Sequence, residues 1–302
     1  TENKNVHFEI LSNPEFLAEG TAIQDLFKSD RVLIGGDQTK SGQKAVKVLV
    51  DIYTNWIAKE KILTTNVWSS ELAKLASNAM LAQRISSINS LSALCEKTGA
   101  KIEELSTAVG MDHRIGSHFL KASVGFGGSC FQKDILNLVY LCKYYGLNEV
   151  AEYWHQVVKI NDYQKERFAQ KIIDHFGGDL TGKKVVILGW AFKANTNDSR
   201  ESAAIYVAEK LFNAGASLQI YDPMISSEMI FKDIELYWKK SYHIDRKKKE
   251  ISLVNEEKQL DLRSDAVVIL TEWKSFKRLN LSFSNVFDGR NLIKKTFYSI
   301  GS

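Results

Sequence analysis

The stretch Gly125-Phe126-Gly127-Gly128-Ser129-Cys130-Phe131-Gln132-Lys133-Asp134 joins a glycine-rich loop to a helical pattern. Three glycines in four positions give a backbone that takes left-handed or strained conformations at little steric cost. The apolar residues that follow are spaced as on one face of an α-helix, namely Ile135, Leu136, Leu138, Val139, Leu141 and Cys142. The sequence therefore predicts a flexible loop that leads directly into an amphipathic helix.

Cys130 falls at or just before the predicted N-terminus of this helix. Backbone N–H groups and the helix dipole stabilise a thiolate at such a position. Asp134 follows one turn later, so its carboxylate shares a helix face with the sulfur. This is a setting for a nucleophile. The alternative is a buried, unreactive thiol, because most free cysteines in intracellular chains behave as small hydrophobic residues.

The bulk composition is that of a globular protein with a real core, since 44% of the 302 residues are hydrophobic. Length suggests two domains, with one or three as alternatives. The net charge of +4 suits a phosphorylated ligand but does not argue for nucleic acid. The three cysteines are too few and scattered for a disulfide framework or a metal site.

Several protein classes are excluded by missing patterns. No apolar run is long enough to span a bilayer and no signal peptide is recognisable, so we expect a cytoplasmic protein without a membrane partner. The six histidines show no metal-ligand spacing, and no G-x-S-x-G sequence is present. These absences argue against a zinc enzyme and a serine hydrolase.

The first part of the chain, residues 1–66, alternates strand and helix patterns. Strands are predicted at Val6–Leu11, Arg31–Gly36 and Ile62–Leu63, and a helix at Ser41–Trp56. Such units are typical of the last part of a doubly wound sheet. No G-x-G-x-x-G sequence occurs here, so the opening strands and the glycine-rich turn between them are predicted to be missing.

The second part, residues 67–178, is predicted to be entirely helical. Cap-type residues at Ser69 and Ser70 begin an apolar stripe that runs towards Glu96 and stops at Gly99. A helix of this length is unusual in globular proteins and suits a spine between domains or a subunit interface. Shorter helices are predicted at 102–109, 135–145 and 150–176.

The third part, residues 179–302, shows a second alternation of strands and helices. Buried strands are predicted at 183–189, 216–221, 266–270 and 286–288, the last of them closing the sheet, and a helix at 202–213. The charged segment between Phe231 and Lys258, with its basic run Arg246–Glu250, is predicted to be a solvated loop or helix face. The fold class is therefore α/β: a remnant of a doubly wound sheet, an all-helical middle with a spine helix, and a C-terminal Rossmann-like domain.

Two pairs of polar residues are candidates for chemistry. Glu15 and Glu19 follow the first predicted strand, on the side where open α/β sheets bind ligands. The alternative is that Pro14 starts a helix whose N-terminal end favours acidic residues. Lys74 and Asn78 lie one turn apart on the long helix, and together with Asp134 they suit an oxyanion or a water, although either is ordinary on an exposed face.

Cations near strand ends and near the glycine loop are candidates for binding phosphate. Phe192–Lys193 and Arg200 follow the strand at 183–189, and Arg290 follows the last strand. Arg114 and Lys121 precede the glycine loop. For each cation taken singly, a solvated surface role is the alternative.

The stretch 125–134 resembles the active-site segment of UDP-glucose 6-dehydrogenases, in the UDP-glucose/GDP-mannose dehydrogenase family. The resemblance continues in order along the chain, at 13–20, 68–72, 83–89, 187–193, 200–202, 221–223, 271–273 and 287–290. Relatives that oxidise GDP-mannose or UDP-N-acetylmannosamine share the Cys-Phe-x-Lys-Asp core, so another nucleotide sugar is an alternative substrate. The resemblance implies a NAD-binding part at 1–66, a central dimerisation domain at 67–178 and a UDP-binding domain at 179–302.

The resemblance also implies a reaction. UDP-glucose would be oxidised at C6 by NAD in two steps to UDP-glucuronate, through a thiohemiacetal and a thioester on Cys130. Lys74 would stabilise the oxyanions, Asn78 and Asp134 would position or activate water, and Glu15 would act as general acid–base.

The remaining implied contacts fall into two sets. The UDP-sugar would contact Glu19, Phe16, Leu17, Arg114, Phe119, Leu120, Lys121, Phe126, Gly127, Phe192, Lys193 and Arg290, with Arg114 reaching from a neighbouring subunit. NAD would contact Glu19, Ser129, Cys130 and Arg200. The subunits would form dimers that assemble into hexamers.

The chain departs from the family pattern in one respect. The glycine-rich turn of the family's first domain has no counterpart, and a chain without it is expected not to hold NAD productively. Two hypotheses follow. The residues are part of a longer dehydrogenase, or they form a nucleotide-sugar-binding fragment without turnover.

Overall fold

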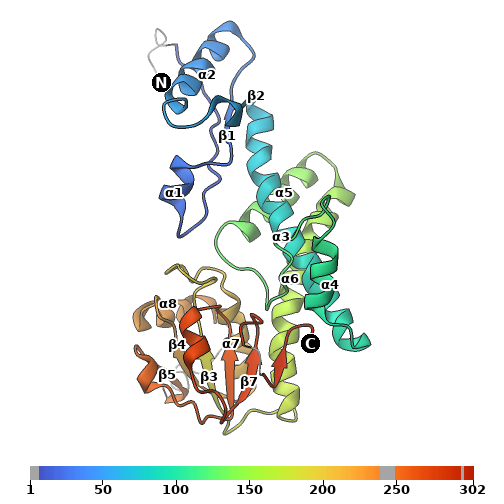
Figure 1. Cartoon of the computed structure of the whole chain (residues 1–302), viewed down its shortest axis with the longest axis vertical. Helices are drawn as coiled ribbons and strands as arrows, with labels where there is room; N and C mark the ends of the chain where they lie inside the picture. The colour runs from blue at the N-terminus through green and yellow to red at the C-terminus, as the bar shows by residue number, and fades with distance from the viewer. Residues whose placement is uncertain (1–6, 239–248, 294–295) are drawn as a thin grey trace. The chain divides into compact units, whose positions relative to one another are not determined.

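The computed structural model describes residues 7–238, 249–293 and 296–302 (Figure 1). The chain divides into two compact units, residues 1–79 and 80–302. The long helix α3 (Val67–Thr98) begins in the first unit and ends in the second. Its 32 residues confirm the predicted long helix, and it ends before Gly99, whose φ of +78° is typical of a helix C-terminus.

The first unit is built on two parallel strands. β1 (Val32–Gly35) pairs with β2 (Ile62–Thr65), with Val32 opposite Ile62. Helix α2 (Lys40–Tyr53) is capped by the side chain of Thr39 and packs its Val46 against β1. The short helices α1 (Ala22–Phe27) and η1 (Lys59–Lys61) complete this unit. The strands and helix predicted between residues 31 and 65 are therefore confirmed.

The first predicted strand is wrong. Residues 7–11 form no strand, and Val6 lies outside the described residues. Ser12 alone makes an antiparallel bridge to Gly35, through backbone hydrogen bonds of 2.8 and 2.7 Å. Pro14 has no N–H group, so the pairing cannot continue past it. Pro14 also does not start a helix, because the next helix, α1, begins at Ala22.

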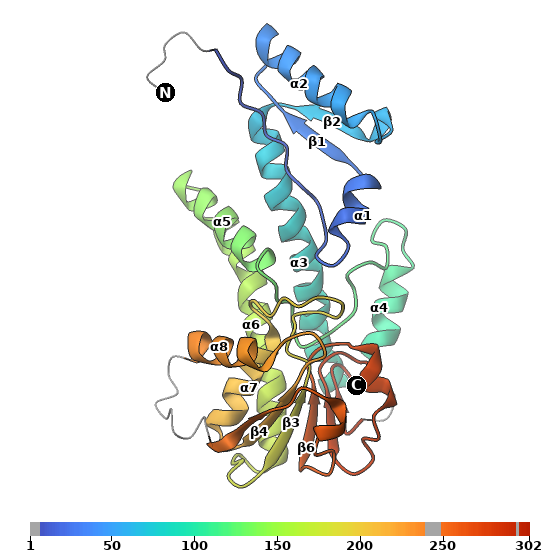
Figure 2. The same cartoon turned by 90° about the vertical axis from the view of Figure 1, so that its left-hand side faces the viewer.

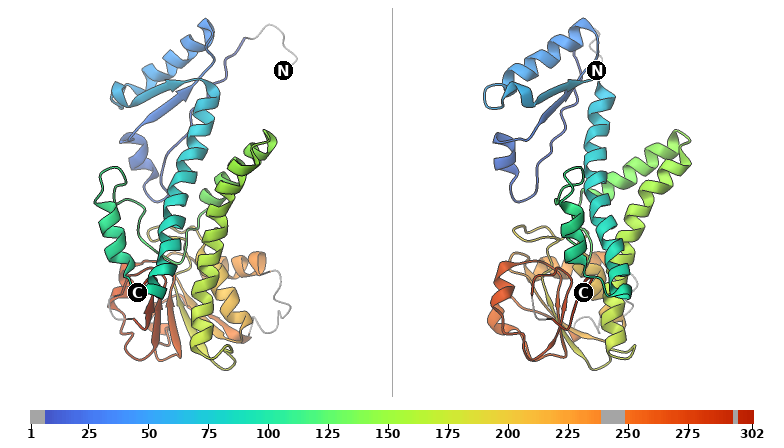
Figure 3. Two further views of the ribbon diagram at one scale, coloured as in Figure 1. Left: turned by 90° about the vertical axis from the view of Figure 1, so that its right-hand side faces the viewer. Right: turned by 45° about the vertical axis from the view of Figure 1, so that its right-hand side comes forward.

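The second unit has a helical part and a sheet part. Helix α4 (Ile102–Gly110) follows α3, and α5 (Phe131–Tyr144) and α6 (Asn148–His175) pack against each other as a hairpin (Figure 2). The part of α3 in this unit lies beside α6 (Figure 3), and the hydroxyl of Ser86 on α3 donates to the carbonyl of Val157 on α6 at 2.7 Å.

The sheet part is a six-stranded parallel sheet with the order β5-β4-β3-β6-β7-β8. Its strands are β3 (Lys184–Leu188), β4 (Ser217–Tyr221), β5 (Ile251–Leu253), β6 (Ala266–Ile269), β7 (Asn285–Asp288) and β8 (Tyr298–Ser299). The connecting helices are α7 (Ala203–Asn213) and α8 (Ser227–Tyr237), with the short η2 (Glu257–Gln259) and η3 (Lys274–Arg278). Strand β6 is buried throughout, as its apolar run predicts.

Two predictions for this sheet need correction. The charged segment between Phe231 and Lys258 includes the last part of helix α8, which agrees with a helix there but is partly buried, and also strand β5; in addition, β8 follows β7, which is predicted to be the last strand. Helix α8 buries Ile230 and Ile234, but its charged residues obscure this periodicity in the sequence. β5 and β8 are edge strands of 3 and 2 residues, too short for a periodic signal. Most of the basic run Arg246–Glu250 lies outside the described residues.

One buried carboxylate links α3, α6 and the C-terminal strand. Glu96 on α3 pairs with Arg167 at 2.7 Å and Lys171 at 3.1 Å, both on α6. It also accepts hydrogen bonds from the Tyr298 hydroxyl at 2.7 Å and the Gly301 N–H at 3.0 Å. Burial opposes the charge, but these donors and Arg167 together hold the pKa of Glu96 below its usual value of 4.5.

Candidate functional site

Cys130 occupies the residue position just before the N-terminus of α5, as predicted. Its side chain is exposed, whereas Cys95 and Cys142 are buried, so Cys130 is not the buried thiol of the alternative interpretation. Its Sγ lies 3.7 Å from Ser129 Oγ, and its carbonyl accepts the N–H of Asp134 at 2.9 Å. Asp134 is buried and lies 3.9 Å from Lys133 Nζ. An accessible thiol therefore begins a helix with a carboxylate one turn away.

The glycines before Cys130 allow the loop to touch the segment after β3. Gly128 has a φ of +84°, and a Cβ there would lie 3.1 Å from the Phe192 ring. A Cβ at Gly127 would lie 2.5 Å from the Glu201 carbonyl oxygen. The Gly128 N–H donates to the Arg200 carbonyl at 2.8 Å. The structure thus brings together predicted residues from two segments that are distant in sequence.

Arg290 is buried and bonds to main-chain carbonyls. Its Nε donates to Leu270 at 2.7 Å, Nη2 to Phe192 at 3.0 Å and Nη1 to Gly125 at 3.3 Å. The guanidinium also lies 3.4 Å from Glu272. Arg290 therefore ties the glycine loop and the Phe192 segment to the carboxyl ends of the sheet, a contact that its sequence position does not reveal.

Several charged residues lie near the carboxyl ends of the central strands. Burial alone would raise the pKa of Glu272, but Arg290, backbone N–H groups and Lys121 hold it below its usual value. Burial raises the pKa of Asp288 despite three backbone N–H donors and the charge of Lys121. Lys193 lies nearby, with its Nζ 5.5 Å from the Phe192 ring centroid. Arg290, Lys121 and Lys193 therefore lie near the carboxyl ends of the strands, where open α/β sheets bind ligands.

Two other predicted cations form ion pairs on the surface. Arg200 chelates Asp198 at 2.9 and 2.8 Å, and Arg114 chelates Asp112 with a shortest contact of 2.6 Å. The two arginine side chains are 61% and 78% exposed, so both guanidinium groups are accessible, although Asp198, the partner of Arg200, is only 6% exposed.

Arg84 on α3 holds the loop that carries Arg114 and Phe119, a role that the sequence analysis missed. It donates to the carbonyls of Ile115, Gly116 and His118 at 2.7–3.0 Å. In this loop Phe119 is exposed and has a φ of +61°, while Leu120 is buried. The available sequence signals were its place in the stretch 83–89, which carries part of the family resemblance, and its position beside the apolar stripe of the long helix.

The first unit brings four predicted residues together. Lys74 Nζ lies 3.0 Å from Glu15 Oε1, and the Leu17 N–H donates to Glu15 Oε2 at 2.7 Å. The Phe16 ring lies 5.7 Å from Lys74 Nζ. Glu15 is largely exposed, so a ligand can reach the pair. Asn78 is buried one turn beyond Lys74, and Glu19 is exposed.

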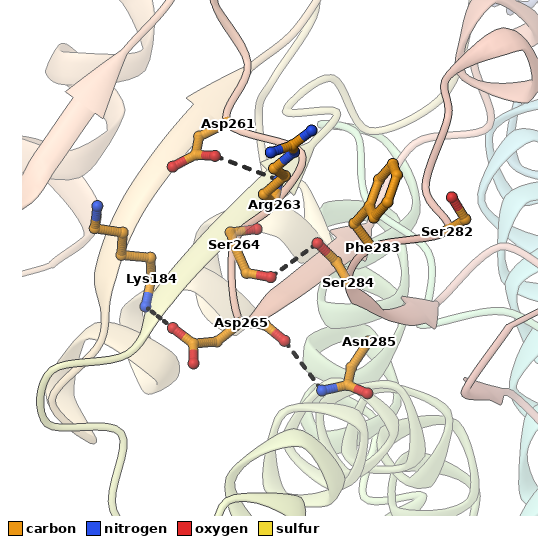
Figure 4. Close-up of a pocket in the computed structure, with 9 residues that line it drawn as sticks. All are labelled: Lys184, Asp261, Arg263, Ser264, Asp265, Ser282, Phe283, Ser284 and Asn285. Carbon is orange, nitrogen blue, oxygen red and sulfur yellow. Dashed lines mark hydrogen bonds between the residues drawn. The ribbon is translucent and has the colours of Figure 1, made fainter.

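A polar crease of about 520 Å³ lies at the opposite, amino-terminal edge of the sheet (Figure 4). Lys184 N–H donates to Asp265 at 2.9 Å, and Asn285 donates to the Asp265 carbonyl at 3.1 Å. Its polar groups largely satisfy one another, and it lies away from the carboxyl ends of the strands. It is therefore not our candidate site.

The described residues contain no cluster of three or more side chains suited to a metal ion. No helix among them is long and apolar enough to cross a membrane.

Comparison with known proteins gives three consecutive family matches. The UDP-glucose/GDP-mannose dehydrogenase models match at 1–57 (NAD binding domain), 68–163 (central domain) and 186–295 (UDP binding domain). The first match covers the region predicted to be the end of a doubly wound sheet, so part of that domain is present.

Similar proteins agree with these matches. The UDP-glucose 6-dehydrogenase of Mus musculus is 54% identical over 297 residues, covering 96% of this chain and 60% of that protein. UDP-glucose 6-dehydrogenase 1 of Glycine max is 52% identical, covering 96% and 64%. A UDP-glucose dehydrogenase structure from Pyrobaculum islandicum has a TM-score of 0.82 at 34% identity, covering 97% of this chain and 63% of that one. The chain thus spans 60–64% of the length of these relatives, and it belongs to the UDP-glucose/GDP-mannose dehydrogenase family.

Proposed function

We propose that these residues serve an NAD-dependent UDP-glucose 6-dehydrogenase, which oxidises UDP-glucose to UDP-glucuronate in two steps. The observation that carries the proposal is the accessible Cys130 at the start of α5, one turn before Asp134. The identity of 54% to curated UDP-glucose 6-dehydrogenases supports the choice of substrate.

Cys130 acts as the nucleophile in this proposal. Its sulfur adds to the carbonyl carbon of the C6 aldehyde to give a thiohemiacetal, and a second oxidation gives a thioester. Water then attacks the thioester carbon, which releases UDP-glucuronate and restores the thiol. Asp134 and Asn78 orient or activate this water.

Lys74 and Glu15 complete the catalytic set. The ammonium of Lys74 stabilises the oxyanions that develop at C6. Glu15, 3.0 Å from Lys74, takes up and returns protons during thioester hydrolysis.

The side chains that we propose to contact NAD are of the kinds that can bind it. A carboxylate (Glu19), a hydroxyl (Ser129) and an exposed guanidinium (Arg200) are groups that bind ribose hydroxyls and phosphates. When bound, NAD supplies the hydride acceptor for both oxidations.

The UDP-sugar binds beyond the carboxyl ends of β3, β6 and β7 in this proposal. Phe192, Lys193 and Arg290 follow these strand ends, and the charge of Lys121 acts at the same place. The other contacts inferred from the family are Phe16, Leu17, Glu19, Arg114, Phe119, Leu120, Phe126 and Gly127. The division of the chain into three domains, at residues 1–66, 67–178 and 179–302, remains a prediction.

Lys193→Ala is expected to weaken UDP-glucose binding about tenfold, because a charge-assisted contact to phosphate is lost. Isothermal titration calorimetry measures the change in Kd. Lys183→Ala is the matched control, since Lys183 pairs with Asp265 at the amino-terminal edge of the same sheet. Equal weakening by both variants would contradict the proposed position of the nucleotide.

We also propose that a second copy of this chain binds the exposed aromatic face of the α5–α6 hairpin. On this face Tyr140, Tyr144 and Tyr145 are each more than half exposed, and neighbouring rings contact one another. Exposed aromatic clusters of this kind mark interaction sites. We propose dimers that assemble into hexamers, in the cytoplasm, whose reducing conditions suit the three free thiols.

Tyr144→Glu is expected to shift the protein towards smaller species, because it buries an unpaired charge in the proposed interface. Analytical ultracentrifugation measures the distribution. Phe283→Glu is the control, since Phe283 is also largely exposed (61%, against 71% for Tyr144) but lines the polar crease at the sheet edge (Figure 4). An unchanged distribution for Tyr144→Glu would rule out this face as the interface.

The direct test of the function is to incubate the protein with UDP-glucose and NAD. NADH and UDP-glucuronate should form together. Faster turnover of GDP-mannose or UDP-N-acetylmannosamine would favour another member of the family. Calorimetric binding of UDP-glucose, without NAD binding or turnover, would favour a nucleotide-sugar-binding fragment.

A further inference from the structure

Asn161 lies in the middle of α6 and is fully buried. Its side chain makes two hydrogen bonds to a single residue of the glycine loop. The Phe126 N–H donates to Asn161 Oδ1 at 2.8 Å, and Asn161 Nδ2 donates to the Phe126 carbonyl at 3.0 Å. Asparagine is a poor helix former, so the tertiary contact explains it better than local structure does.

The loop on either side of Phe126 is also held by buried groups. The Ser123 N–H donates to Asn89 on α3 at 2.8 Å, and Gln164 on α6 donates to the Ser123 carbonyl at 2.8 Å. Arg290 donates to the Gly125 carbonyl, and the Arg200 carbonyl accepts a hydrogen bond from the Gly128 N–H. In the centre of this segment Asn161 makes both hydrogen bonds to Phe126. Without them the buried N–H and carbonyl groups of Phe126 would be left unpaired.

The shape of the loop fits Asn161 closely. Gly125 has a φ of +123°, and a Cβ there would lie only 2.8 Å from Asn161 Oδ1. Phe126 in turn contacts Phe131, with ring centroids 5.7 Å apart in an edge-to-face arrangement. Phe131 is the first residue of α5 and the neighbour of Cys130. A continuous path of contacts therefore leads from Asn161 to the thiol.

We propose that Asn161 is a positioning residue that holds Cys130 at the N-terminus of α5 by clamping the Phe126 peptide groups. Its effect on catalysis rests on the function proposed above. Its effect on the geometry of the thiol does not, and it can be measured without turnover.

The test is the rate at which iodoacetamide alkylates Cys130 in the full chain, followed by peptide mass spectrometry. Asn161→Ala should slow this reaction about threefold or more, because the sulfur is no longer held beside the helix N–H groups. Ser86→Ala is the control, since it removes another buried hydrogen bond between α3 and α6 without touching the loop. Buried Cys95 and Cys142 should stay unmodified. An unchanged Cys130 rate, or fast labelling of all three thiols, would overturn the proposal.

Gly125→Ala is a second, independent way to disturb the same contact, and it retains Asn161. It should slow Cys130 alkylation, whereas Gly178→Ala should not. Gly178 also has a positive φ, of +95°, but has open space around its Cβ position. Equal rates for the two alanine variants would contradict the role of the Asn161 contact.

Turnover separates positioning from substrate binding. In Asn161→Ala, kcat for UDP-glucose should fall about tenfold or more, and KM should rise by a smaller factor, because the proposed UDP-sugar contacts Phe126 and Gly127 lie in the same loop. A rise in KM at constant kcat would overturn the proposal. If the unaltered protein shows no turnover, the proposed function fails, and the alkylation rates still decide the role of Asn161.

Discussion

Cys130→Ala is expected to abolish NADH formation from UDP-glucose, with a loss of about a thousandfold or more in kcat. In the proposed mechanism the sulfur carries both covalent intermediates, and alanine offers no atom to form either. Binding of UDP-glucose should change little, because the proposed phosphate contacts come from Lys193 and Arg290, which remain.

NADH absorbance under saturating substrates measures the effect. Cys142→Ala is the matched control, because Cys142 lies on the same helix but is buried and away from its N-terminus. The control can lower thermal stability but should retain turnover. An unaffected rate in Cys130→Ala would remove the thiol from the mechanism.

Glu96→Gln is expected to lower the free energy of unfolding by about 3 kcal/mol at neutral pH. Glutamine can still accept the hydrogen bonds from Tyr298 and Gly301, but it cannot pair with the charge of Arg167. The Arg167 side chain is only 11% exposed, so its charge would be left buried with its ionic partner removed. The helical part and the C-terminal strand of the second unit would loosen together.

Urea unfolding followed by circular dichroism measures this loss. Glu104→Gln serves as the control, because its pair with Lys101 is exposed and such pairs contribute little to stability. Equal midpoints for Glu96→Gln and the unaltered protein would show that the buried ion pair is not stabilising.

The effect of Glu96→Gln should depend on pH with a defined sign. The folded-state pKa of Glu96 lies below its usual value of 4.5, so its stabilising contribution is complete above that pH. The contribution is lost as the pH falls through the lower, folded-state pKa. The difference in unfolding free energy between the two proteins should therefore narrow under acidic conditions and stay constant near neutrality.

Local patterns predicted most of the elements that surround the candidate site. The apolar stripe of α3, the buried runs of β3 and β6 and the glycine loop before Cys130 each carry their signal within a few residues. Their positions follow from helical or strand periodicity and from the conformational freedom of glycine. The same approach failed for β5, β8 and α8, where short edge strands and surface charges hide the apolar pattern.

The sequence by itself determined the α/β class, the spine helix and the place of Cys130 at the start of a helix. Only the tertiary structure decided which groups hold that loop. Asn161 is 35 residues from Phe126, and Arg290 is 165 residues from Gly125. Both bond to main-chain atoms, which every residue has, so no side-chain pattern marks the contact. Folding creates these pairings by burying distant peptide groups that must find partners once water is excluded.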